Sequence, residues 1–526
     1  MSQPDTNRRL DQLHWDEAYA RDLPADPSTD PGSRTVTGAG FSWVEPSPAS
    51  APATLGWSRE VADLLGLDET TCESADFAAV FSGARMPEGA HPYAMAYGGH
   101  QFGHWAGQLG DGRAMVLGTV RDRDGGRQVL QLKGAGRTPY SRFADGRAVL
   151  RSSLREYLCS EAMHHLGIPT TRALSLVLTG DEVVRDMLYD GHPAAEPGAV
   201  TCRVSPSFVR FGSFELPASR NDRELLGTLV EHVLEEHFPA LLEEAGGDVV
   251  AAVPAFFAEV AERTAALIVD WMRVGFVHGV MNTDNLSILG LTIDFGPYGW
   301  LENFDPGWTP NTTDAQMRRY RYGDQAKIAL WNLLQLANAL TQLTRDPEPL
   351  QVTLDAWGAR YEERFHAMVA ERLGWGEWRD GDEERFTSLV DLLVRSEADH
   401  VRWHRQLADV PTALDASDDD LLAPLDGTWY RADLVEGELR GAWVAWLRDW
   451  ARRARDSGLD DDARRVRMDA VNPRYVLRNW VAQLAIDAAE AGDPSELAAI
   501  HEVLRRPYED QSGDVPDRID ALRPEW

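Results

Sequence analysis

Three residues of the sequence could together hold a nucleoside triphosphate and the metal ion that accompanies it. Lys133 ends an apolar run typical of a strand, and Glu156 follows on a segment with helical spacing. Asp294 closes a later apolar run and is followed by Phe and Gly. A fixed cation, a carboxylate that orients it and a carboxylate that binds a metal spread the negative charge of a triphosphate. The order of these residue types therefore predicts phosphate chemistry.

The order of a strand Lys, a helix Glu and an Asp-Phe-Gly triplet is also that of a protein-kinase core. A second stretch, His278 to Asn285, ends nine residues before Asp294. In kinases the metal-binding Asn follows the catalytic-loop His by seven residues, as Asn285 follows His278 here. The position of the kinase catalytic Asp holds Val280, which cannot accept a proton. The nearest carboxylate that could replace it is Asp284.

Arginine residues gather where the sequence is rich in glycine. Six glycines lie between Gly98 and Gly112, ahead of the apolar run 114–120, and this stretch is expected to be a loop. The arginines of this half of the chain include Arg113, Arg142, Arg147, Arg203 and Arg210. Guanidinium groups bind phosphate oxygens in a bidentate fork, and glycine backbone amides can approach phosphate closely. Because Gly-Lys-Ser/Thr is missing, the stretch is not a Walker A loop.

Each candidate also has an ordinary structural explanation. Lys133 could be a surface lysine at a strand end, and Asp294 could cap a turn. The spacing from Ser153 to Glu156 fits a capping box, in which the Glu bonds back to the helix N-terminus. Asp284 could form an Asx turn, and His278 is better explained as a structural loop histidine than as a base. The joint order of these residues favours the nucleotide site.

The elements that must position these residues alternate between strand and helix patterns. Residues 114–120 and 128–133 flank an Asp-Gly-Gly turn and predict a β-hairpin. Apolar residues four apart predict a helix over 153–166 that ends at Gly167. Other expected strands cover 174–189, 200–211, 286–289 and 291–293. Other expected helical segments cover 57–65, 225–275, 324–343, 350–373, 386–407, 441–457 and 495–506.

Composition limits the classes of partner and compartment. The 526 residues include 52 basic and 84 acidic ones, a net charge of −32, which opposes binding to nucleic acid. No run reaches the ~18 uninterrupted apolar residues of a membrane span. The three cysteines have no paired spacing, which excludes a disulfide framework and favours a reducing compartment. Residues 1–24 lack the apolar core of a secretory signal, so a cytoplasmic location is expected.

Four long strings of the sequence are unusual enough to carry a family resemblance. They are Tyr97-Gly-Gly-His-Gln-Phe-Gly-His to Arg113, Leu132-Lys-Gly-Ala-Gly to Arg142, Asp145-Gly-Arg to Ser153, and His278-Gly-Val-Met-Asn-Thr-Asp-Asn285. These strings closely resemble the selenoprotein O family, from about Phe41 to the stretch Asn472–Asn479. Members of that family are pseudokinase-fold protein adenylyltransferases, and some bacterial members are reported to use UTP. The resemblance implies a nucleotide flipped relative to kinases, so that AMP is transferred and pyrophosphate is released.

The resemblance also implies roles for individual residues. Its nucleotide contacts fall on Gly110, Gly112, Arg113, Lys133, Asp145, Gly146, Arg203, Arg210 and Asp294. Its metal ligands fall on Asn285 and Asp294, and its proton acceptor falls on Asp284. The catalytic set is completed by Lys133 and the Glu156 that pairs with it. The implied ligands are ATP as substrate and Mg²⁺ or Mn²⁺.

The sequence departs from that family in one respect. Many members carry a selenocysteine or cysteine close to the C-terminus, whereas the last cysteine here is Cys202. Redox control through such a residue is therefore not expected. The sequence indicates neither the protein substrates, nor the preferred nucleotide or metal, nor the oligomeric state.

We therefore expect an α+β, bilobal protein-kinase-like (pseudokinase) fold with an all-helical C-terminal extension. The expected parts are a lead-in segment 1–90, a β-rich nucleotide-binding lobe 91–215, a helical lobe 216–345 and a helical extension 346–526. The expected activity is transfer of AMP from ATP to Ser, Thr or Tyr hydroxyls of proteins. Two alternatives stay open: a phosphotransferase in which Asp284 replaces the absent Asp, and a non-catalytic nucleotide-binding scaffold.

Overall fold

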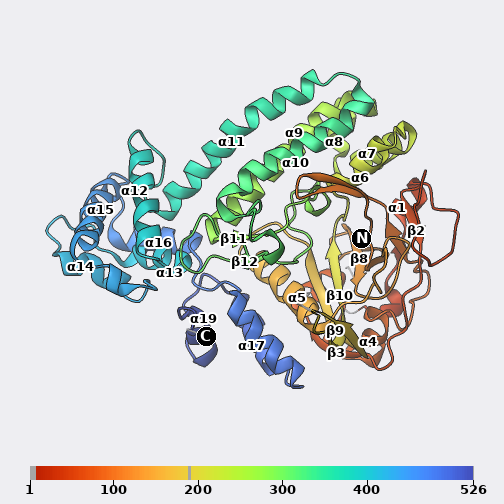
Figure 1. The fold of residues 1–526 in the computed structure, drawn as a ribbon, viewed down its shortest axis with the longest axis horizontal. Coiled ribbons are helices and arrows are strands. Elements are labelled where there is room, and N and C mark those ends of the chain that lie inside the picture. The colour runs from red at the N-terminus through yellow and green to blue at the C-terminus, as the bar shows by residue number, and fades with distance from the viewer. Residues whose placement is uncertain (1–7, 187–190, 525–526) are drawn as a thin grey trace.

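The computed structural model describes residues 8–186 and 191–524 and is mixed α/β, with its main sheet toward one end and helices toward the other (Figure 1). The sheet is antiparallel, in the order β2-β4-β7-β8-β10-β9-β3, with β1 paired to β7. Its strands are β1 (Trp15–Asp16), β2 (Phe41–Trp43), β3 (Ala53–Trp57), β4 (Tyr93–Met95), β7 (Ala114–Arg121), β8 (Arg127–Lys133), β9 (Arg172–Arg185) and β10 (Ala194–Ser205).

The two faces of the sheet differ around the end of β8. Leu132 and Cys202 lie opposite each other on β8 and β10 and belong to a buried apolar cluster. Because side chains alternate along a strand, Gln131 and Lys133 point to the other face. Arg203 lies opposite Gln131 in the same register, and directly opposed residues share a face. One face of the sheet therefore carries three polar side chains side by side.

Helices cover both faces of this sheet. The apolar cluster joins it to α2 (Arg59–Leu65) and α4 (Ala75–Phe81), with the short α3 (Glu69–Cys72) between them. Helix α2 ends at Gly66, whose φ of +78° suits a residue without a β-carbon. The polar face receives α5 (Leu150–His165), which contacts β9 and β10. Helix α5 thus lies on the face of the sheet to which Lys133 points.

The rest of the chain is almost entirely helical (Figure 1). The remaining helices up to residue 372 are α1 (Ala18–Asp22), α6 (Phe211–Ser219), α7 (Arg223–His237), α8 (Pro239–Glu244), α9 (Val249–Val274), α10 (Gln325–Thr344) and α11 (Glu348–Arg372). The later helices are α12 (Asp382–Arg395), α13 (His400–Gln406), α14 (Asp418–Leu422), α15 (Gly437–Arg455), α16 (Asp461–Val471), α17 (Asn479–Glu490), α18 (Ser495–Leu504) and α19 (Asp514–Asp520).

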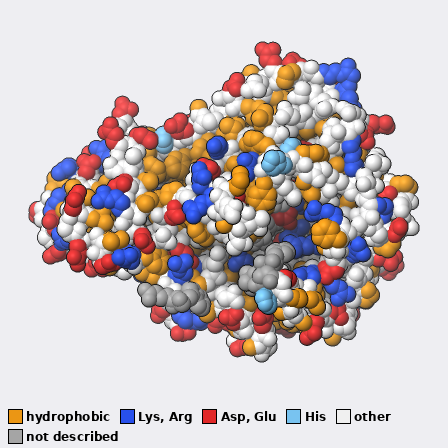
Figure 2. Space-filling model, viewed as in Figure 1, with side chains coloured by type: hydrophobic (Ala, Val, Ile, Leu, Met, Phe, Trp, Pro, Cys, Tyr) orange, Lys and Arg blue, Asp and Glu red, His pale blue; other side chains and the backbone are white. Residues whose placement is uncertain are grey.

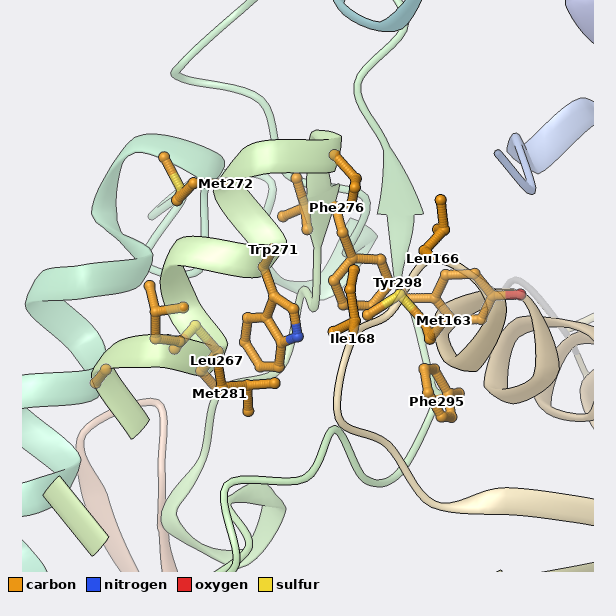
Figure 3. Packing of buried hydrophobic residues seen from close by; sticks show 14 of the residues in the cluster. Met163, Leu166, Ile168, Leu267, Trp271, Met272, Phe276, Met281, Phe295 and Tyr298 are labelled. Carbon is orange, nitrogen blue, oxygen red and sulfur yellow. The ribbon is translucent and has the colours of Figure 1, made fainter. Parts of the chain in front are cut away.

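An aromatic cluster joins α5 to α9 and to the loop that carries Asp294 (Figure 3). Phe295 contacts the ring of Tyr298 at 5.8 Å between centroids and that of Phe276 at 6.4 Å. Phe276, on the short strand β11 (Phe276–Val277) paired with β12 (Gly299–Trp300), packs in turn on Trp271 of α9. Burial of Phe295 in this cluster fixes the backbone of its neighbour Asp294.

Several predicted elements are confirmed. The hairpin is β7–β8, and the predicted helices at 57–65, 324–343, 350–373, 441–457 and 495–506 correspond to α2, α10, α11, α15 and α18. The helical segment 225–275 is α7, α8 and α9, interrupted near Gly246 and Gly247. The segment 174–189 corresponds to β9, and 200–211 is confirmed only as far as Ser205, where β10 ends. Residues 187–189 lie outside the described residues, as do residues 1–7 of the N-terminal stretch.

Other predictions are wrong. The strands at 286–289 and 291–293 are reduced to isolated bridges, such as Leu286 with Thr292. The helix at 386–407 is two helices, because Asp399 caps the start of α13 with its side chain. The glycine-rich loop contains a second hairpin, β5 (Gly98–Gln101) with β6 (His104–Gln108). Residues 1–90 supply β1, β2 and β3, so a boundary near residue 90 passes through the sheet.

Two further expectations concern the membrane and the thiols. None of the helices in residues 8–186 and 191–524 combines the length and the apolar character that a membrane crossing requires. Cys72, Cys159 and Cys202 are all buried and unpaired, so the prediction that they form no disulfide framework is confirmed.

Candidate active site

A cleft of about 780 Å³ lies between the polar face of the sheet and the loops that follow α9. Figure 2 shows this side of the molecule, with a hollow that contains basic and acidic side chains. The predicted site residues that line the cleft are Gly110, Gly112, Arg113, Lys133, Asp145, Gly146, Arg203, Asp284, Asn285 and Asp294. The other two, Glu156 and Arg210, contact members of this set.

Lys133 is held between two carboxylates. Its Nζ lies 2.7 Å from Glu156 Oε2 and 3.3 Å from Asp294 Oδ1. Burial lowers the pKa of Lys133, while the two carboxylates oppose that shift. Helix α5 begins at Leu150, three residues earlier than expected, so Glu156 does not cap its N-terminus. The capping-box explanation is therefore wrong, and Glu156 orients Lys133.

Asp294 is surrounded by cations. Besides Lys133, its Oδ1 accepts a hydrogen bond from Arg203 at 2.6 Å, and its Oδ2 accepts one from Arg210. Burial alone would raise the pKa of Asp294, but these cations hold it well below its usual range. The backbone φ angle of Asp294 is +58°, which is uncommon for a residue other than glycine. Such strain at a cleft is typical of functional sites.

The two buried arginines of the site, Arg203 and Arg210, each keep one donor that no described residue satisfies. Arg203 donates to Gln131 and to Glu156, yet its Nε is buried without a hydrogen-bond partner among the described residues. Arg210 donates to the Asp284 carbonyl at 2.9 Å, yet its Nη2 is equally unsatisfied within those residues. Both guanidinium groups lie over aromatic rings, Arg203 over Phe208 and Arg210 over Tyr97, so each positive charge is held in place although one donor is unsatisfied.

Asp284 is the middle residue of a short 3₁₀ helix, Thr283–Asn285, and is almost completely buried. Its Oδ2 accepts a hydrogen bond of 3.2 Å from Gln101 Nε2, whereas Oδ1 has no donor among the described residues. Burial raises the pKa of Asp284 to about 7. A carboxylate with such a pKa can accept a proton near neutral pH.

Asn285 and Asp294 line the same cleft. The Asn285 amide nitrogen donates to the Val280 carbonyl at 2.9 Å, which leaves its Oδ1 without a donor in the part of the chain described. A carboxylate and an amide oxygen are hard ligands, which suit Mg²⁺ or Mn²⁺. The residues present therefore fit the metal ion that the resemblance implies.

The outer part of the cleft carries exposed cations. The side chains of Arg113 and Arg142 make no hydrogen bond or ion pair with residues 8–186 or 191–524. Asp145 is instead engaged by Arg185 at 2.7 Å and by the Arg147 backbone amide at 3.0 Å. Free guanidinium groups at the mouth of the cleft can meet an incoming anion without first breaking an internal pair.

His278 is a structural residue, as expected. It is buried, donates from Nε2 to the Ile293 carbonyl at 2.9 Å and stacks on Trp271. Burial lowers the pKa of His278, which favours the neutral ring. It therefore fixes the loop that carries Asp284 to the segment that carries Asp294.

Three further cleft residues were not predicted from the sequence. Gln101 touches Asp284, Arg185 touches Asp145, and Asp111 accepts hydrogen bonds from the Met95 backbone amide and from Gln131. Burial raises the pKa of Asp111. Gln101 and Asp111 lie within the string Tyr97–Arg113, so that string was the signal that could have found them.

The cleft thus brings together the residues that the sequence predicts for a nucleotide site. Residues 38–505 match the family described as "Protein adenylyltransferase SelO". The chain is 54% identical over 529 residues to a "Protein nucleotidyltransferase YdiU" of Rhodopirellula baltica, an alignment that covers 98% of this chain and 97% of the relative. Proteins of the same name from Azoarcus sp. and Aromatoleum aromaticum are 54% and 53% identical, with the same coverage. The chain belongs to the SelO family.

Proposed function

We propose that this protein is a nucleotidyltransferase that transfers AMP from ATP to Ser, Thr or Tyr hydroxyls of proteins, with release of pyrophosphate. The observation that carries the proposal is that Lys133, Asn285 and Asp294 line one cleft rather than separate cavities. Three cations and two carboxylates form ion pairs beside this cleft. The cations are Lys133, Arg203 and Arg210, and the carboxylates are Glu156 and Asp294. The excess of positive charge suits the phosphates of a nucleotide.

The reaction needs a nucleophile, a proton acceptor and a leaving group. The hydroxyl oxygen of the acceptor protein attacks the α-phosphorus, and its proton passes to the Asp284 carboxylate. The bond from the α-phosphorus to the oxygen bridging to the β-phosphate breaks, and pyrophosphate leaves with that electron pair. Lys133, Arg203 and Arg210 stabilise the charge on the phosphates, and Glu156 keeps Lys133 in place.

Asn285 and Asp294 would hold Mg²⁺ or Mn²⁺, which neutralises phosphate charge when bound. With a nucleotide in place, Lys133 and the two arginines can exchange Asp294 for phosphate oxygens, which frees carboxylate lone pairs. The Asp294 carboxylate is 20% exposed, so it is accessible from the cleft. Its three cation contacts hold it in one orientation until that exchange occurs.

We also propose that the fold is a kinase-like one in which the nucleotide is bound in the reverse orientation. Support comes from the pairing of a strand Lys with a helix Glu and from the loop placement of Asp294. A valine at position 280 agrees with a reaction that does not use the kinase base. Transfer of UMP from UTP stays within the same proposal, because the contacts described concern phosphates.

The proposal is tested with purified protein and ATP labelled at either the α- or the γ-phosphate. Wild-type protein with Mg²⁺ or Mn²⁺ should incorporate the α-label, whereas Lys133→Ala and Asp294→Ala should not. As a matched control, Arg395→Ala removes an exposed residue of α12 and should label normally. Incorporation of γ-label, with a mass increase of one phosphate, would instead identify a phosphotransferase. Nucleotide binding without pyrophosphate release would identify a scaffold.

A further inference from the structure

The β5–β6 hairpin lies directly against the loop that carries Asp284. The His100 backbone amide donates to Thr283 Oγ1 at 2.7 Å, and the Phe102 backbone amide donates to Asn282 Oδ1 at 3.3 Å. Gln101, between these two residues, donates through its side chain to Asp284 Oδ2. Three successive hairpin residues therefore bind three successive residues of the loop.

This hairpin is itself anchored to the helical side of the cleft. His100 Nδ1 lies 2.5 Å from Glu215 Oε2 of α6, and its ring contacts Trp331 of α10. The Phe102 backbone amide also donates to the Tyr320 hydroxyl at 2.8 Å. A hairpin held at both of these positions cannot easily shift relative to the loop, so Gln101 is presented from a fixed frame.

The Asp284 side chain has little room beside this hairpin. A β-carbon on Gly99 would lie 2.6 Å from Asp284 Oδ1 and 2.9 Å from its Cβ. On the other side, a β-carbon on Gly212 would lie 3.4 Å from the Asp284 Cα and 2.1 Å from the Gly98 carbonyl oxygen. Two glycine backbones thus enclose the residue, and sterics restrict where its carboxylate can turn.

Within that enclosure, hydrogen bonding selects the orientation. Gln101 Nε2 is the only side-chain donor to the Asp284 carboxylate in the described part of the chain. Arg210 holds the backbone of Asp284 through its carbonyl but does not contact its carboxylate. The hydrogen bond from Gln101 to Oδ2 therefore opposes rotation of the carboxylate, and Oδ1 has no donor among the described residues.

We propose that Gln101 is a positioning residue for the transfer reaction: it fixes the orientation of the Asp284 carboxylate, which receives the proton of the acceptor hydroxyl. This inference rests on the proposed function, because it assigns Gln101 a role in the same chemical step. Gln101 also lines the nucleotide cleft, which places its amide beside the reacting groups rather than behind them. A displacement of about 1 Å in such a group can lower turnover by roughly 100-fold.

The test measures nucleotide binding and turnover separately. Gln101→Ala should bind a non-hydrolysable ATP analogue within about twofold of wild type, because no cation of the cleft depends on Gln101. Its rate of AMP incorporation at saturating ATP should fall roughly 10- to 100-fold. Gln101→Glu keeps the shape but replaces the donor with a carboxylate, and should lower the rate at least as far. His104→Ala, an exposed position of the same hairpin, should retain the wild-type rate.

A double-mutant comparison separates positioning from folding. With Asp284→Ala as background, adding Gln101→Ala should cause no further loss, because the partner of the hydrogen bond is already missing. Unchanged turnover of Gln101→Ala, or an equal loss in both backgrounds, would overturn the inference while leaving the proposed function intact. Failure of the wild-type protein to incorporate α-label would instead remove the proposed function itself, and this inference with it.

Gly99→Ala provides a second, independent perturbation. It leaves Gln101 unchanged but pushes against the Asp284 carboxylate, so turnover should fall while nucleotide binding persists. A variant that melts as wild type does and still turns over normally would show that the orientation of Asp284 is not critical. That result would contradict the positioning role.

Discussion

Glu156 Oε2 lies 2.7 Å from Lys133 Nζ, so an ion pair joins helix α5 to strand β8 at the cleft. Glu156 Oε1 also accepts a hydrogen bond from Arg203 at 3.2 Å. One carboxylate therefore sets the positions of two phosphate-binding cations. Its effect on catalysis can be measured without removing either cation.

Glu156→Gln should lower kcat/KM for ATP by about tenfold or more. The amide keeps the shape but loses the charge that holds Lys133, and charge-assisted hydrogen bonds contribute about 1.5–3 kcal/mol each. Steady-state rates of AMP incorporation check this. Glu231→Gln, on the exposed side of α7, is the matched control and should leave the rate unchanged. An unaltered rate in Glu156→Gln would show that Lys133 does not need the negative charge of Glu156 for its role in the reaction.

Arg113→Ala should raise the KM for ATP roughly tenfold with little change in the melting temperature. The Arg113 side chain is exposed at the cleft and pairs with no described residue, so its removal leaves no buried group unsatisfied. Binding of a non-hydrolysable nucleotide analogue measures the affinity, and calorimetry measures stability. Arg395→Ala controls for the loss of one exposed arginine. Equal affinities in the two variants would exclude a phosphate contact at Arg113.

Glu161 should make the folded protein sensitive to acid. It is fully buried, and Arg172 binds it at 2.8 and 2.6 Å, with Ser58 and the Ala173 amide as further donors. Burial opposes ionisation, but these hydrogen bonds lower the pKa of Glu161 from 4.5 to about 2. Because the pKa is lower in the folded than in the unfolded protein, ionised Glu161 stabilises the fold at pH values above the unfolded pKa. This stabilisation is lost as the pH falls from about 4.5 toward 2.

This contribution is about 3 kcal/mol by the usual conversion of a pKa shift. Thermal melting at pH 7 and pH 3 measures it. Glu161→Gln should melt lower than wild type at pH 7, and the difference between the two proteins should shrink at pH 3. A constant difference at both pH values would show that another group carries the acid sensitivity.

Arg478→Ala should destabilise the protein by about 3 kcal/mol or more. Arg478 is buried and pairs with Asp399 and Glu302, each at 2.7 Å, so its removal leaves two carboxylates in a dry environment. Arg474, four residues earlier, is partly exposed and forms two ion pairs that water can replace. Arg474→Ala should therefore lower the free energy of unfolding by less. Denaturant unfolding compares the two variants. A smaller effect at Arg478 would contradict this reading.

Much of the local structure could be predicted because its signals are local. The alternation in 128–133 and the four-residue spacing after Ser153 gave a strand and a helix that the structure contains. Glycine weakened the signal in 98–108, since it is permitted both in turns and in strands, and the second hairpin there was missed. The split at Asp399 was missed because apolar spacing continues across it.

The site was predictable where residue type and chain order are distinctive, as for Lys133 and Asp294. The contacts that support the site residues were not predictable, because they join positions far apart in the chain. Gln101 and Asp284 are separated by 183 residues, and nothing near either one indicates the other. The same holds for Arg185 with Asp145, 40 residues away. Pairings of this kind depend on tertiary packing and appear only when the sheet and helices are assembled.

The enclosed cysteines have a practical consequence. Cys72, Cys159 and Cys202 are buried, and burial raises the pKa of each thiol, to about 12 for Cys72. Maleimide dyes and spin labels react with exposed thiolates and should therefore leave the native protein unmodified. A single Phe143→Cys substitution, at a rim position that is 95% exposed, would then accept one reporter group without a cysteine-free background. Fluorescence from that position would follow nucleotide arrival in real time.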